Sequence, residues 1–111
     1  MNKLASICAG LLFLCSNSVF AEDHLIAAQQ HVNTAVVHGE AGHTQILIKH
    51  AKAALEDTLA ASLVAKGVAK NHLDLAAKEL QQSIDLANLG HIGAATIHAE
   101  SAEKHIKAST K

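Results

Sequence analysis

The chain has 111 residues, with 9 basic residues, 10 acids, 9 histidines and a formal net charge of −1 at pH 7. So few basic residues make a surface for nucleic-acid phosphates improbable, and we expect no nucleic-acid partner. At this length we expect one domain with a modest core.

Residues 1–21 are predicted to be a secretory signal peptide. Lys3 gives a basic start, an apolar run extends from Leu4 to Cys15, and Val19-Phe20-Ala21 is an acceptable cleavage site. The apolar run is shorter than the roughly 20 residues that a membrane-spanning helix requires. We therefore expect a protein of the periplasm that has no contact with the membrane after signal cleavage.

The predicted mature domain, residues 22–111, has an unusual composition. Both cysteines, the only methionine and both phenylalanines lie within residues 1–21. The mature domain therefore has no thiolate to act as a ligand or nucleophile, no disulfide, and no aromatic ring on which a nucleic-acid base could stack. The chain has no proline, and its many alanines, leucines, lysines and glutamates favour helix throughout.

Glycines are the only breaks in the helical pattern, and they predict four helices, at about 23–38, 44–66, 70–88 and 92–109. The expected fold is all-α: an antiparallel four-helix bundle preceded by a cleaved signal peptide.

The bundle is predicted to consist of two copies of one helical hairpin, residues 22–66 and 70–109. A shift of 48 residues places Gly42 on Gly90, His43 on His91 and other histidines and alanines on their counterparts. A single hairpin could not bury its apolar stripe, so two copies are expected to pack together.

The apolar residues follow a heptad pattern that predicts the core. Positions a and d are Leu25, Val32, Leu73, Leu80, Ile92, Ala99, Ile106, Ala28, Ala35, Leu47, Ala54, Ala76, Ala95 and Ala102, with Val36, Ile48, Leu55 and Ile84 at position e. All nine histidines then fall at position g, beside the predicted core and outside it.

Five of the eight intervals between successive histidines are seven residues, a spacing that keeps them on one stripe of a helix. Neighbours on such a stripe are about 10.5 Å apart, too far to share an ion, so the ligands must come from the facing helix. Counting outward from each glycine turn pairs His38 with His43, His31 with His50, His24 with Asp57, Leu86 with His91, Glu79 with His98, and His72 with His105. The predicted metal ligands are the nine histidines, together with Asp57 and Glu79.

One further site depends on processing. Cleavage after Ala21 would make Glu22-Asp23-His24 the N-terminus. A free amine followed by histidine at the third position can bind Cu(II) or Ni(II) through the amine, two deprotonated amides and the imidazole.

The segments His38–Thr44, Lys49–Lys52, Gly90–Gly93 and His105–Ser109 resemble the small metal-binding protein family. The resemblance covers nearly all of residues 22–111 and implies a histidine-rich, exported four-helix bundle that binds copper and other divalent metals. The chain has fewer histidines than that pattern, since Asp57, Glu79 and Leu86 stand where the heptad rhythm calls for histidine.

We predict a monomeric, non-catalytic protein whose partners are metal ions and which buffers or scavenges copper. Cu²⁺ is favoured by the nitrogen ligands and its affinity order, and Ni²⁺ and Zn²⁺ remain open. An enzyme such as a bundle oxidase is disfavoured, because the single Glu-x-x-His, Glu40 to His43, lies in a turn. The alternative function is a periplasmic chaperone or adaptor whose histidines respond to pH.

Overall fold

The computed structural model describes residues 2–111, and side-chain environments from residue 20 onward. Within this range the chain forms four helices and no strand: α1 (Asn2–Glu40), α2 (Thr44–Val64), α3 (Gly67–Asn88) and α4 (Ile92–Ser109). The predicted all-α class is confirmed, and the last three helices agree with the predicted ranges to within one helical turn.

The first helix differs from its predicted range, because it begins at Asn2 and not near residue 23. Its first half contains no proline, and nothing there interrupts a helix that continues through Ala21. Cleavage after Ala21 is not tested by this structure of the whole chain and stays a prediction. In residues 2–111 no helix is both long and apolar enough to cross a membrane.

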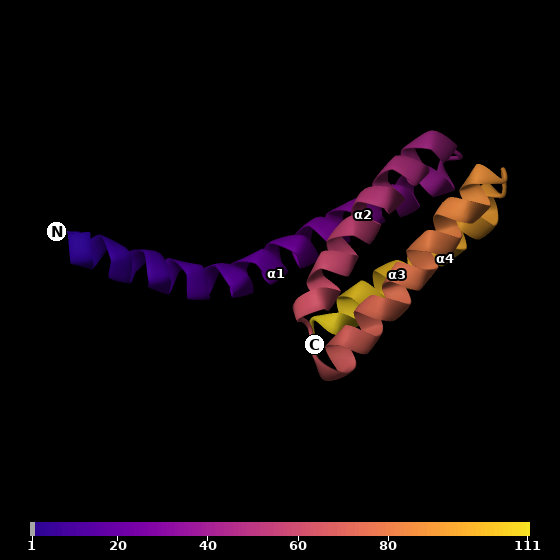
Figure 1. The fold of residues 1–111 in the computed structure, drawn as a ribbon. Coiled ribbons are helices and arrows are strands. Elements are labelled where there is room, and N and C mark those ends of the chain that lie inside the picture. The colour runs from indigo at the N-terminus through magenta and orange to yellow at the C-terminus, as the bar shows by residue number, and fades with distance from the viewer. Residues whose placement is uncertain (1) are drawn as a thin grey trace.

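The helices form a bundle in which each packs against two neighbours. α1 lies against α2 and α4, α3 also lies against α2 and α4, and the diagonal contact between α2 and α4 is minor. Figure 1 shows that the α1–α2 and α3–α4 turns lie at the same end of the bundle, while the first part of α1 extends beyond the opposite end. The helices therefore run alternately up and down.

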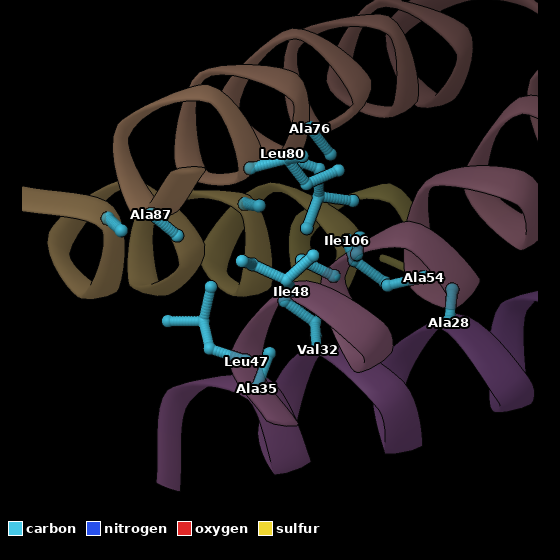
Figure 2. Close-up of a cluster of buried hydrophobic side chains, with 14 residues drawn as sticks. Ala28, Val32, Ala35, Leu47, Ile48, Ala54, Ala76, Leu80, Ala87 and Ile106 are labelled. Carbon is cyan, nitrogen blue, oxygen red and sulfur yellow. The ribbon is translucent and has the colours of Figure 1, made fainter. Parts of the chain in front are cut away.

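The core contains apolar side chains from all four helices (Figure 2). Its members are Ala28, Val32, Ala35, Leu47, Ile48, Ala51, Ala54, Ala76, Leu80, Ile84, Ala87, Ala95, Ala102 and Ile106. The heptad pattern predicted most of these residues. Leu25, Leu55 and Ile92 were also expected in the core but are only half-buried, and Leu25 borders an open groove beside Thr110.

Small polar residues also enter the core, which the apolar pattern did not predict. Thr58 and Ser83 are fully buried at positions where the heptad calls for apolar side chains. The Ser83 hydroxyl donates to the Ala95 carbonyl oxygen at 2.7 Å, whereas the Thr58 hydroxyl has no partner among the described residues. An unpaired buried hydroxyl costs about 1–3 kcal/mol, so the bundle tolerates this polar atom at the expense of stability.

Candidate metal centre

Six pairs of position-g residues face each other across the two hairpins, and we call each pair a rung. Counted outward from the glycine turns, the rungs are His38–His43, His31–His50 and His24–Asp57 between α1 and α2, and Leu86–His91, Glu79–His98 and His72–His105 between α3 and α4. Five of the six pairs are in direct side-chain contact through polar atoms. The predicted pairing is therefore observed for these five pairs, while the role of these residues as ligands stays a prediction.

The first rung of each hairpin is fixed by the way in which the preceding helix ends. The His43 N–H donates to the His38 carbonyl oxygen at 2.8 Å, and the Gly42 N–H donates to the Gly39 carbonyl oxygen at 3.1 Å. Gly42 has a φ of +81°, which glycine adopts without strain. These are the two hydrogen bonds of a Schellman motif, a common ending of an α-helix. The motif brings together the two residues joined by its longer hydrogen bond, one in the last turn of the helix and one just beyond the glycine. Here those two residues are His38 and His43.

The α3–α4 turn has the same geometry. The His91 N–H donates to the Leu86 carbonyl oxygen at 2.9 Å, and Gly90 has a φ of +86°. His43 and His91 also begin the next helices, as the N-cap residues of α2 and α4 with similar backbone angles. The two histidines are thus in equivalent positions, but His43 faces an imidazole and His91 faces a leucine.

The three His–His rungs have nearly identical geometry. Their Nδ1 atoms are 3.0 Å apart in His38–His43, 2.9 Å in His31–His50 and 3.1 Å in His72–His105. The ring planes are inclined by 37°, 31° and 35° in the same order. In the absence of metal, an Nδ1–H of one ring can donate to the unprotonated Nδ1 of the other.

The same spacing suits two ligands of one metal ion. An ion about 2.0–2.1 Å from each nitrogen, a usual metal–imidazole distance, would hold the two at an angle of roughly 90–100°. This angle is close to that of neighbouring ligands in a square plane, the arrangement typical of Cu(II) and Ni(II). The Nδ1–Nδ1 distances of the His–His rungs are therefore compatible with two ligands of one such ion.

Two rungs combine a histidine with a carboxylate. His24 Nδ1 lies 2.6 Å from Asp57 Oδ1, and His98 Nδ1 lies 2.6 Å from Glu79 Oε2. Each pair is a hydrogen bond in which the imidazole N–H donates to the carboxylate, and it strengthens when the imidazole is protonated. A mixed rung offers one imidazole nitrogen and one carboxylate oxygen, a donor set that suits copper less well than two imidazoles.

The rungs lie at the edge of the core, as position g predicts. Seven histidines are half-buried, and His43 and His91 are exposed. Burial lowers the pKa of His50 from its ordinary value of 6.5, and the nearby charges of His31, Lys49 and His38 lower it further. His50 is therefore neutral and able to bind metal at a lower pH than an ordinary histidine.

In the described part of the chain, no group of three or more histidine, cysteine or acidic side chains lies close enough to surround one ion. Successive rungs are about 10.5 Å apart along the helices, so they do not share an ion. Five of the six rungs bring together two possible ligands, and water would complete the coordination of a bound ion.

A four-helix bundle with paired imidazoles along the seams of its hairpins belongs to the class of small helical proteins that hold metal ions near their surface. The chain matches the Small metal-binding protein family over residues 1–109, and it is a member of that family. Its function is therefore the binding of metal ions. Among curated proteins, none matches the chain.

The sequence pattern predicted that His38 and His43 pair but not the helix ending that brings them together. The spacing of five residues differs from the seven-residue step between histidines of one helix, and the signal for its structure is the glycine between the two histidines, at position 42. Glycine one residue before a histidine, after a helix, is the pattern of the Schellman ending.

Proposed function

We propose that this protein binds copper in the periplasm and acts there as a buffer or scavenger, without catalysing a reaction. The observation that carries the proposal is the set of three His–His rungs, each with its Nδ1 atoms 2.9–3.1 Å apart. The proposal extends the metal binding of the family to a particular metal, compartment and role.

Copper is favoured by the ligands and their spacing. All three His–His rungs offer imidazole nitrogen, and divalent copper binds such ligands more tightly than the other first-row divalent ions do. An ion held at a near-right angle between the two nitrogens would suit copper or nickel better than zinc, which prefers a tetrahedral site. Nickel and zinc are the competing ions that a binding experiment must include.

Buffering is favoured by the openness of the sites. Two ligands at a half-exposed edge leave the remaining coordination positions to water, through which ions can enter and leave. A structural zinc site is closed by four protein ligands, and a di-iron oxidase surrounds its metals with carboxylates from several helices. The rungs resemble neither, which supports reversible holding of copper.

Residues 1–21 support the periplasmic location, since a basic start, an apolar run and a small-residue cleavage site are the features of a secretory signal peptide. After cleavage, residues 22–111 would work as a monomer with metal ions as partners and with no nucleic acid or membrane bound.

The equivalent positions of His43 and His91 provide the test. His43→Gln removes one ligand of a His–His rung, and His91→Gln removes a histidine that faces Leu86. We expect His43→Gln to lose one bound copper ion and His91→Gln to retain the full number. The measurement is metal content of untagged protein after dialysis against copper, nickel and zinc together. Equal losses in the two variants, or a preference for zinc, would contradict the proposal.

A further inference from the structure

We propose that signal-peptide cleavage creates an additional copper site at the new N-terminus, Glu22-Asp23-His24, and that the uncleaved chain cannot form it. This inference rests on the proposed export of the protein. It concerns a site that lies outside the His–His rungs and uses main-chain nitrogen atoms as ligands.

The chemistry of the site requires a free α-amine two residues before a histidine. The amine of Glu22, the deprotonated amides of Asp23 and His24, and the Nδ1 atom of the His24 ring would surround the ion in a plane. Such a square of nitrogen atoms suits Cu(II). Binding releases a proton from each of the two amides, and from the amine where it is protonated, so affinity rises with pH.

In the uncleaved chain the α-amine ligand is absent, and the two amide ligands are engaged in helical hydrogen bonds. Residues 22–24 lie inside α1, where Glu22 has no free amine and each backbone N–H donates to the carbonyl four residues earlier. The ring of Phe20 packs edge-on against the His24 ring, with centroids 4.2 Å apart. The precursor therefore offers copper neither the amine nor the amides.

Cleavage after Ala21 removes these obstacles together. The carbonyl groups of Val19 and Phe20, which accept hydrogen bonds from Asp23 and His24 in the helix, depart with the signal peptide, and so does the Phe20 ring. The first N–H groups of a helix have no internal partner, so the amides of the new first turn are no longer engaged as helical donors. The same cut supplies the α-amine.

One contact opposes the site and provides a way to test it. His24 Nδ1 lies 2.6 Å from Asp57 Oδ1, so copper must take this nitrogen from the carboxylate. If His24 binds metal as part of the rung, Asp57 is a ligand and its loss weakens binding. If His24 binds metal as part of the terminal chelate, Asp57 is only a competitor and its loss does not weaken binding.

The site would give the protein a copper-binding group that appears only on export. While the chain carries its signal peptide the terminal chelate does not exist, and the cleavage that releases the mature domain also creates it.

The test uses the whole chain, exported and processed by the cell, in three forms: unchanged, with one serine inserted between Ala21 and Glu22, and with Asp57→Asn. The insertion makes the histidine fourth in the mature chain and leaves every rung intact. Intact mass identifies the mature N-terminus, and Cu(II) is then titrated in the presence of free glycine as a competitor. Visible absorption distinguishes copper bound to amides, which absorbs at shorter wavelength, from copper bound to imidazoles alone.

We expect the unchanged protein and Asp57→Asn to begin at Glu22 and to retain one equivalent of copper with the amide-type absorption. We expect the insertion variant to lack that equivalent. A different N-terminus, an insertion variant that retains the amide-type copper, or its loss in Asp57→Asn would overturn the inference. Failure of the proposed function is recognised separately, by equal copper losses in His43→Gln and His91→Gln.

Discussion

Gly39 on α1 lies directly against Thr96 on α4, with no space for a side chain between them. A Cβ atom at position 39 would overlap the Thr96 hydroxyl and would come within 2.7 Å of Leu47 Cδ1. Gly39 follows His38, so the close approach of the two hairpins occurs beside the first His–His rung. The glycine therefore has a packing role in addition to its place in the turn.

Gly39→Ala should destabilise the protein by about 1–3 kcal/mol, because an extra methyl group at a closely packed position forces its neighbours to move. Gly93 is the matched control, since it lies in α4 with nothing within 4 Å of its hypothetical Cβ. Gly93→Ala should increase the free energy of unfolding by at most about 1 kcal/mol, the helix preference of alanine over glycine. Urea unfolding of both variants measures the difference, and a stable Gly39→Ala protein would contradict the close contact.

The protein should fold without metal. The core contains no histidine, and its apolar side chains are buried independently of the rungs. Circular dichroism of metal-free protein should show a largely helical chain, and copper should raise the melting temperature because it binds the folded form preferentially. A random-coil spectrum of the metal-free protein would show that metal drives folding.

The two hairpins should bind different amounts of copper. Replacing His31, His38, His43 and His50 removes two His–His rungs. Replacing His72, His91, His98 and His105 removes one His–His rung, one mixed rung and the histidine that is paired with Leu86. Both changes delete the same number of imidazoles, so independent surface ligands would give equal losses. We expect a larger loss of copper from the first replacement, measured by metal analysis after dialysis.

Copper binding should weaken between about pH 7 and 5, because protons compete with the ion for imidazole nitrogen. Because the pKa of His50 is lowered, a smaller fraction of the protein molecules has this ring protonated at a given pH. The His31–His50 rung should therefore hold copper to lower pH than the His72–His105 rung. Copper titrations of variants that retain one rung each would measure this order.

The lowered pKa of His50 also makes the stability of the metal-free protein depend on pH. The unfolded chain takes up a proton at the ordinary His50 value of 6.5 and the folded chain only at lower pH, so the folded protein loses stability as the pH falls below 6.5. His50→Gln should reduce this dependence of stability on pH.

For the copper titrations, an affinity that is unchanged between pH 7 and 5 would show that carboxylates, not histidines, are the ligands.

Leu86→His should convert the Leu86–His91 rung into a fourth His–His rung. Leu86 and His91 have the backbone hydrogen bond that joins His38 and His43, so a histidine at position 86 would face His91 in the same way. The half-buried leucine packs against the core, and its loss should cost about 1 kcal/mol. The variant should bind one more copper ion than the unchanged protein, and Leu86→Gln, the control for the lost leucine, should not.

The sequence predicted the pairing of the rungs because two simple rules determine it. A step of seven residues returns to the same side of a helix, and a short glycine turn aligns the helices that it joins. It did not predict the buried positions of Thr58 and Ser83, since a hydroxyl group in a sequence does not indicate whether a partner lies nearby. The contact of Gly39 with Thr96 also could not be predicted, because it depends on how the two hairpins pack.

The position of the histidines beside the core has a consequence for how such a chain can change. Substitution at position g would add or remove a possible metal ligand while leaving the fully buried core side chains unchanged. Asp57, Glu79 and Leu86 occupy such positions in a bundle that is otherwise intact. The number of metal ions that such a chain binds could therefore change by single substitutions, with the four-helix architecture retained.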